Sequence, residues 1–198
     1  MKRTLIISTL VTSALLSTTL SAKDGKNKEA PSYKHEKKLA KKSIKKLMQN
    51  MQKNFKKAMK SGGPANAVTF CSQKAQDIVT KTNSELGKNV TISRITLKPR
   101  NEKHLAKGDE AKILSSLQTL KENGVQLPKI LVQKVDDKHT RVYKPIIVKA
   151  KCLICHGTED KLHPKAKEAI KTKYPNDKAT GYKVGDLRGA FVVDIVKK

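Results

Sequence analysis

The chain has 198 residues, and its 43 lysine and arginine residues outnumber 17 aspartate and glutamate residues, which gives a formal net charge of +26. Only five of these basic residues are arginines, and aromatic residues make up 4% of the chain. Nucleic-acid grooves usually combine arginine and aromatic side chains with lysine, so the composition argues against a nucleic-acid partner. It leaves open a solvated lysine coat or a surface that attracts an acidic protein or anionic lipid.

The N-terminus has the pattern of a secretory signal peptide. Lys2 and Arg3 precede an apolar stretch from Leu5 to Leu20, and Leu20-Ser21-Ala22 forms a candidate cleavage site. We expect residues 1–22 to direct export to the periplasm and to be removed. An uncleaved leader would be a weak membrane anchor, because the stretch is short for a span. No later segment approaches a transmembrane span.

Residues 23–36 are polar and charged, which predicts a flexible linker ahead of one domain at residues 37–198. From Leu39 to Met59, apolar residues recur at three- and four-residue steps, which indicates one face of a long amphipathic helix. Gly62-Gly63-Pro64 ends this helix, and Pro64 is suited to the first turn of a second one. The inner face of this second helix is expected to carry Val68, Cys71, Ala75, Ile78 and Val79.

Strands then alternate with helices along the rest of the chain. Strands are predicted at residues 90–96, 130–135, 141–148 and 189–196, and helices at residues 109–123 and 164–171. Helices followed mainly by strands favour an α+β fold with an antiparallel sheet.

The most specific motif is Cys152-Leu153-Ile154-Cys155-His156, the C-x-x-C-H pattern that attaches c-type haem. Two thiols at this spacing can bond to the two vinyl groups of one porphyrin, and His156 then reaches the iron as the proximal ligand. A disulfide pair or half of a zinc site is the alternative, but only His163 lies nearby as a further zinc ligand. We therefore predict one covalently attached haem c, in keeping with export.

Several residues compete for the opposite face of the iron. No methionine follows His156, which argues against an ordinary small cytochrome c with its downstream Met ligand. The upstream candidates are Cys71, Met48, Met51, Met59, His104 and His139. Cys71 is the odd cysteine of an exported chain, although a small buried hydrophobe is the competing interpretation. The methionines also suit core packing, and the two histidines also suit a charged surface.

Taken together, these motifs resemble a family of PAS-like c-type haem domains. Such domains occur as small periplasmic or lumenal proteins and as extracytoplasmic sensor regions of histidine kinases. The resemblance covers residues 38–196 and rests on Phe70-Cys71 with Ala75, Leu97-Lys98-Pro99-Arg100-Asn101, Cys152 to Gly157, Tyr174-Pro175 with Asp177, Thr180-Gly181-Tyr182, and Gly185 to Ala190. The chain departs from the family at Glu102-Lys103-His104, where a proline and a second asparagine are usual.

The resemblance implies a PAS-like fold and a haem held by His156 on one face and by the Cys71 thiolate on the other. A thiolate favours ferric iron, so we expect a low potential and a Cys71 bond that weakens on reduction. These properties suit a redox sensor, or a sensor of CO or NO, that acts through a signalling partner. The alternative is a monohaem electron-transfer protein that docks an acidic redox partner through its lysines.

Two arginines near the family motifs are candidate partners of the haem propionates. Arg100 and Arg188 can each form bidentate contacts with a carboxylate, with a surface or turn role as the alternative. No catalytic triad, carboxylate pair or phosphate loop is apparent, so an enzyme is not expected.

Overall fold

The computed structural model describes residues 32–197. The predicted signal peptide, residues 1–22, and residues 23–31 of the predicted linker lie outside the described residues. Within the described part, no helix is long and apolar enough to cross a membrane.

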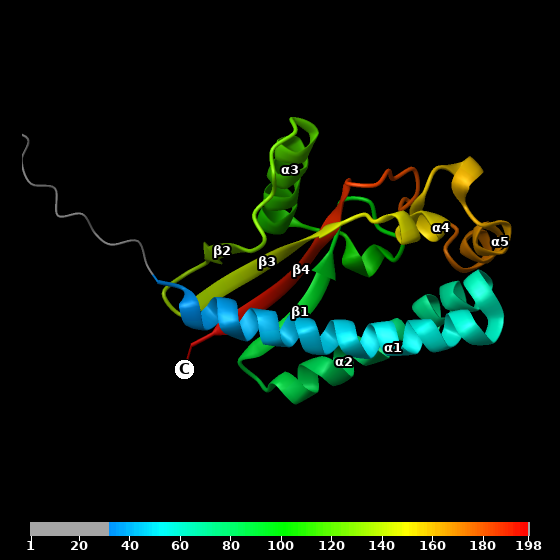
Figure 1. Ribbon diagram of the computed structural model, residues 1–198. Coiled ribbons are helices and arrows are strands. Elements are labelled where there is room, and N and C mark those ends of the chain that lie inside the picture. The colour runs from blue at the N-terminus through cyan, green and yellow to red at the C-terminus, as the bar shows by residue number, and fades with distance from the viewer. Residues whose placement is uncertain (1–31, 198) are drawn as a thin grey trace, which may run out of the picture. The chain divides into compact units, whose positions relative to one another are not determined.

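A four-stranded antiparallel sheet organises the domain (Figure 1). Its order is β1 (Val90–Ile95), β4 (Leu187–Val196), β3 (His139–Ile147) and β2 (Leu131–Lys134). The last strand, β4, is therefore central and pairs with both β1 and β3. The predicted α+β class with an antiparallel sheet is confirmed, and each predicted strand is present to within two residues of its expected ends.

Helices cover both faces of the sheet. Helices α1 (Lys34–Gln73) and α2 (Ala75–Leu86) lie on one face, and α3 (Gly108–Glu122) lies on the other (Figure 1). In β4, Val193 and Ile195 pack toward α1, whereas Ala190 and Val192 belong to the core under α3. This burial on both faces explains why β4 has an almost unbroken apolar sequence.

The predicted break in the N-terminal helix is confirmed as a kink. Gly62 and Gly63 have non-helical dihedral angles within α1, and Gly63 has a φ of 66°, which favours glycine. A second break at Lys74 was not predicted; it divides the expected second helix into Pro64–Gln73 and α2. Cys71 thus lies one turn before a bend in the chain.

The start of α1 corrects the predicted linker. The helix begins at Lys34, so residues 34–36 are helical, and Glu36 is buried 3.5 Å from Lys197 Nζ. The polar composition of residues 34–36 gave no sign of a helix, because the first turn of α1 buries few side chains.

The outer edge of β1 is paired by a side chain from α2. Asn83 Nδ2 donates to the Ile92 carbonyl at 3.0 Å, and the Ile92 N–H donates to Asn83 Oδ1 at 2.7 Å. This double contact holds α2 against the edge strand.

Candidate functional site

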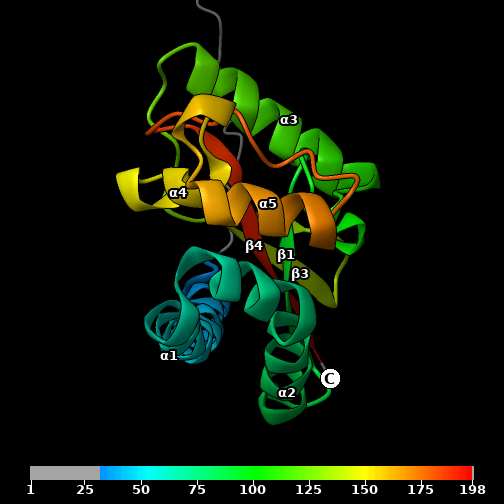
Figure 2. The same ribbon diagram turned by 90° about the vertical axis from the view of Figure 1, so that its right-hand side faces the viewer.

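The C-x-x-C-H motif lies in two short helices at one end of the sheet. Cys152 ends η2 (Ala150–Cys152), and α4 (Leu153–His156) carries the rest of the motif. Figure 2 shows α4 beside α5 (Pro164–Lys173), close to the far end of α1. Val68 of α1 packs on Ala166 and Ile170 of α5, and Cys155 packs against the same cluster. These contacts bring the C-terminal part of α1 to the C-x-x-C-H motif.

His156 is oriented by a backbone acceptor. Its Nδ1 lies 2.7 Å from the carbonyl oxygen of Ala179, so Nδ1–H donates to that oxygen. Burial, together with the charges of Arg100 and Arg188, holds the pKa of His156 well below its usual value. The imidazole is therefore neutral at pH 7, and its Nε2 lone pair is available to a metal.

A buried ion pair supports this arrangement. Arg100 Nη2 donates to Asp177 Oδ2 at 2.9 Å and to the Cys155 carbonyl at 2.6 Å. Asp177 Oδ1 in turn accepts the Ala179 N–H at 2.8 Å. The two charged side chains are 11% and 8% exposed. Arg100 thus joins the motif to the loop that orients His156. The alternative that Arg100 is a surface residue is wrong.

Cys71 approaches the same motif from α1. Burial and the nearby Cys155 raise the pKa of the Cys71 thiol, whereas Arg100 and Arg94 act in the opposite direction. Cys71, Cys152 and Cys155 are all free thiols. Within residues 32–197, no three His, Cys, Asp or Glu side chains gather as a metal site.

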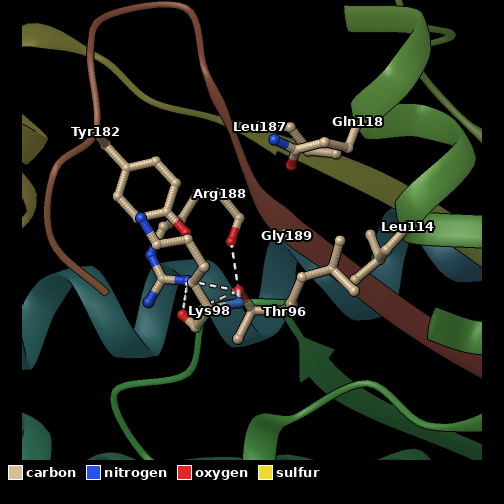
Figure 3. Close-up of a pocket in the computed structure, with 9 residues that line it drawn as sticks. Thr96, Lys98, Leu114, Gln118, Tyr182, Leu187, Arg188 and Gly189 are labelled. Atoms are coloured by element: carbon tan, nitrogen blue, oxygen red, sulfur yellow. Dashed lines mark hydrogen bonds between the residues drawn. The ribbon is translucent and has the colours of Figure 1, made fainter. Parts of the chain in front are cut away.

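Three arginines surround the site with unpaired donors. The Nε atoms of Arg94, Arg100 and Arg188 are buried and have no hydrogen-bond partner among the described residues. Arg188 Nη1 donates to Thr96 Oγ1 at 2.7 Å and to the Lys98 carbonyl at 3.1 Å (Figure 3). Its guanidinium carbon lies 5.3 Å from the centre of the Tyr182 ring. Arg188 is 5% exposed, so its surface alternative is also wrong.

The charge of this cluster is incompletely balanced by protein groups. Arg100 pairs with Asp177, but among residues 32–197 neither Arg94 nor Arg188 has a carboxylate within ion-pair distance. A buried charge destabilises the folded protein unless it is paired with an opposite charge. The cluster therefore suits a ligand that carries more than one carboxylate.

Sequence reasoning missed Arg94. Side chains of a strand point alternately to its two faces. In β1, Val90, Ile92 and Arg94 therefore share the face that α1 and α2 cover. An arginine at a position that the two-residue period assigns to the buried face was the available signal.

The other proposed distal ligands are placed differently. Met48 and Met51 pack against the core under α1, as their competing interpretation predicts. His139 Nε2 lies 2.7 Å from Asp194 Oδ1 at the start of β3, on the part of the strand remote from the motif.

His104 is not a freely exposed surface residue. Burial and then the charges of Arg94 and Arg188 lower its pKa to about 4. Its backbone carbonyl accepts the Thr96 N–H at 2.9 Å, which places the Glu102-Lys103-His104 segment beside the end of β1.

Comparison with known proteins identifies the family of this chain. The family model described as Tll0287-like matches residues 27–196. The chain belongs to the Tll0287-like family. Among solved structures, the crystal structure of the cyanobacterial haem protein Tll0287 matches with a TM-score of 0.55 and 23% identity, over 84% of this chain and 98% of that chain. This identity level shows a shared fold. Comparison with curated proteins finds no significant match.

In this Tll0287-like chain, separate motifs fold into one support for the site. Lys98 Nζ donates to the Thr180 carbonyl at 2.8 Å, and the Lys178 N–H donates to the Pro99 carbonyl at 2.9 Å. A Cβ atom on Gly189 would lie 2.2 Å from the Ile95 carbonyl oxygen, so β4 approaches β1 too closely for any side chain there. These residues position the site.

The residues present fit a haem c. The motif supplies two free thiols for attachment and a neutral imidazole for the iron, and the arginines supply unpaired donors for two propionates. Tyr182 lies edge-on to His156, with ring centres 6.3 Å apart.

Proposed function

We propose that this protein is a periplasmic monohaem c-type protein that acts as a redox or diatomic-gas sensor. Cys152 and Cys155 attach the haem, His156 is the proximal iron ligand and Cys71 is the distal ligand. The observation that carries the proposal is the His156 Nδ1 contact with Ala179 beside two free thiols, which leaves Nε2 for the iron. Membership of the Tll0287-like family and the shared fold with the haem protein Tll0287 support it. A PAS-like classification of the domain belongs to the same proposal, and no enzymatic activity is proposed.

The three arginines hold the anionic edge of the group. Arg94 and Arg188, which lack a carboxylate partner in the described chain, bind the propionates through their unpaired donors. Arg100 keeps Asp177 and the Cys155 carbonyl as partners and offers its Nε alone. This assignment retains Arg188, adds Arg94 and gives Arg100 mainly a positioning role.

Cys71 provides the response. When bound, the haem supplies an iron that alternates between ferric and ferrous states and accepts CO or NO. Burial and then Cys155 raise the pKa of the Cys71 thiol, and Arg100 and Arg94 oppose this only in part. Ferric iron would favour the thiolate form of Cys71, and a thiolate would in turn stabilise the ferric state. A Cys71 thiolate would hold ferrous iron less tightly than ferric iron, so reduction or a competing gas would free Cys71. Because Cys71 precedes the break at Lys74, its release loosens Pro64–Gln73, and this segment transmits the signal to a protein partner.

Electron transfer is the alternative function. The net charge of +26 favours rapid encounter with an acidic redox partner. A carrier would keep both axial ligands through reduction and exchange electrons at a positive potential. A sensor would lose Cys71 on reduction and bind CO.

The first experiment tests attachment. The protein is exported in a host that matures c-type haem, denatured and stained for haem. Staining is expected in the wild type and absent from the Cys152→Ser/Cys155→Ser double variant. A wild type that matures without haem but with stoichiometric zinc would refute the proposal.

The second experiment tests the distal ligand. The oxidised protein should give a low-spin EPR signal typical of thiolate ligation, and Cys71→Ala should abolish the signal while covalent haem remains. Met59→Leu and His104→Gln serve as controls that should leave the signal unchanged. An unaltered spectrum in Cys71→Ala would assign the distal position to another ligand.

A further inference from the structure

The exposed face of α1 carries the highest density of charge in the chain. Residues 34–60 contain eleven lysines and a single carboxylate, Glu36, which is buried. Ten of these lysines are exposed: Lys34, Lys37, Lys38, Lys41, Lys42, Lys45, Lys53, Lys56, Lys57 and Lys60. The remaining one, Lys46, pairs with Glu85 of α2 at 2.7 Å. The exposed lysines therefore form a face without an exposed carboxylate on the same segment, which we call the lysine face.

The position of the lysine face is fixed by the helix and by the packing of its opposite side in the core. Ala40, Ile44 and Leu47 direct the apolar side of α1 into the core under the sheet. The exposed lysines recur at three- and four-residue steps within residues 34–45 and again within residues 53–60. The segment from 34 to 60 is about 40 Å long at about 1.5 Å per residue. The face ends with the kink at Gly62 and Gly63, because Pro64–Gln73 contains no lysine. The charge is thus confined to the straight part of α1 that precedes the kink (Figure 1).

This arrangement is unfavourable for the isolated protein. Like charges three or four residues apart on a helix repel one another, and pairs such as Lys38 and Lys42 lack the carboxylates that would relieve this. An external polyanion would remove the repulsion. Salt would weaken the attraction, since the charges are exposed.

We propose that the lysine face binds the surface of an anionic lipid bilayer. Clusters of lysine on one side of a helix are the pattern that binds anionic headgroups. A straight face about 40 Å long meets a flat bilayer along its whole length, whereas a convex acidic protein meets only part of it. The apolar side of α1 is used in the protein core, so the helix lies on the bilayer and does not insert. This binding is independent of the haem.

Vesicle sedimentation tests the proposal with the full-length matured protein. Phosphatidylcholine vesicles with phosphatidylglycerol are expected to bind the protein at about 0.1 M salt, and vesicles of phosphatidylcholine alone are not. Each lysine near an anionic surface strengthens binding about fivefold. Replacement of Lys38, Lys42, Lys45 and Lys56 by Gln should therefore weaken binding by several hundredfold at most.

A matched control separates this face from total charge. Four other lysines are exposed outside α1, and their replacement by Gln removes the same charge: Lys103, Lys107, Lys129 and Lys183. The control should keep binding within a fewfold of the wild type, and circular dichroism should show both variants folded. Equal losses in the two variants would overturn the proposal, as would equal binding to neutral and anionic vesicles. If the anionic vesicles fail but an acidic protein is bound through these four lysines, the face is a protein-docking surface and the lipid assignment is wrong.

Discussion

Replacement of Asp177 by Ala should strongly destabilise the protein, because it leaves the buried Arg100 charge without its partner. The ion pair is 2.9 Å long, and both side chains are about nine-tenths buried or more. Loss of one member of a buried ion pair typically costs about 3–5 kcal/mol. In a domain of this size, each 1 kcal/mol lowers the melting temperature by about 2–4 °C, so a decrease of about 6–20 °C is expected.

The same replacement should disturb His156. Asp177 Oδ1 accepts the Ala179 N–H, and the Ala179 carbonyl accepts His156 Nδ1–H, so the change reaches the imidazole through one peptide unit. Thermal unfolding followed by far-ultraviolet circular dichroism measures stability, and the Soret band of the matured protein reports on the ligand.

Two variants make this reasoning refutable. Asp137→Ala removes a carboxylate that is 94% exposed and paired with Lys134, and it should change stability by no more than about 0.5 kcal/mol. Arg100→Met/Asp177→Leu removes both members of the ion pair, so neither is left as an unpaired buried charge, and this double variant should be more stable than Asp177→Ala. An Asp177→Ala protein as stable as the wild type, or a double variant less stable than the single one, would show that the ion pair does not support the site.

Further predictions concern the arginine cluster, a buried histidine and the sheet edge. Arg94→Gln should lower the midpoint potential and retain covalent haem, because loss of a nearby cation favours ferric iron; redox titration should show no such decrease in Arg141→Gln, whose guanidinium pairs with Asp194. The pKa of His104 is lowered from 6.5 to about 4, so the unfolded chain binds the proton more readily. The resulting stability is complete above pH 6.5 and is lost as the pH falls toward 4, by at most about 3 kcal/mol. Urea unfolding at several pH values measures how the free energy of unfolding changes with pH. His104→Gln should make this change smaller, and an unchanged pH dependence would contradict the burial of His104. Asn83→Ala should lower the free energy of unfolding by about 1–3 kcal/mol, because the backbone N–H and carbonyl of Ile92 lose their hydrogen bonds to Asn83. Asn123→Ala is an exposed control, and an equal or greater loss of stability in the control would argue against this.

Local patterns predicted most of the secondary structure. The apolar face from Leu39 to Met59, the Gly62-Gly63-Pro64 break and the apolar sequence of β4 each reflect forces that act within a few residues. The start of α1 and the break at Lys74 were not predicted, because a polar first turn and a single residue of non-ideal geometry leave no periodic signal.

The candidate site was predicted in part. The C-x-x-C-H motif is contiguous, so its spacing alone indicates haem attachment. Arg94 was not predicted as a site residue, because its role depends on which face of β1 the helices cover. The surface alternatives for Arg100 and Arg188 failed because their burial comes from segments distant in sequence, namely the loop at Asp177 and the end of β1 at Thr96.

The sequence by itself determined the element types, the C-x-x-C-H motif and the excess of lysine, because these depend on residues that are close together in the chain. Only the tertiary structure decided that the Cys71 and Cys155 thiols lie near enough to affect one another's charge, that Arg100 pairs with Asp177, and that Arg94 and Arg188 remain without carboxylate partners in the described chain. Contacts of this kind join segments more than 70 residues apart. They form because the sheet and its helices pack in one arrangement that buries the apolar faces, and that arrangement is a property of the whole fold.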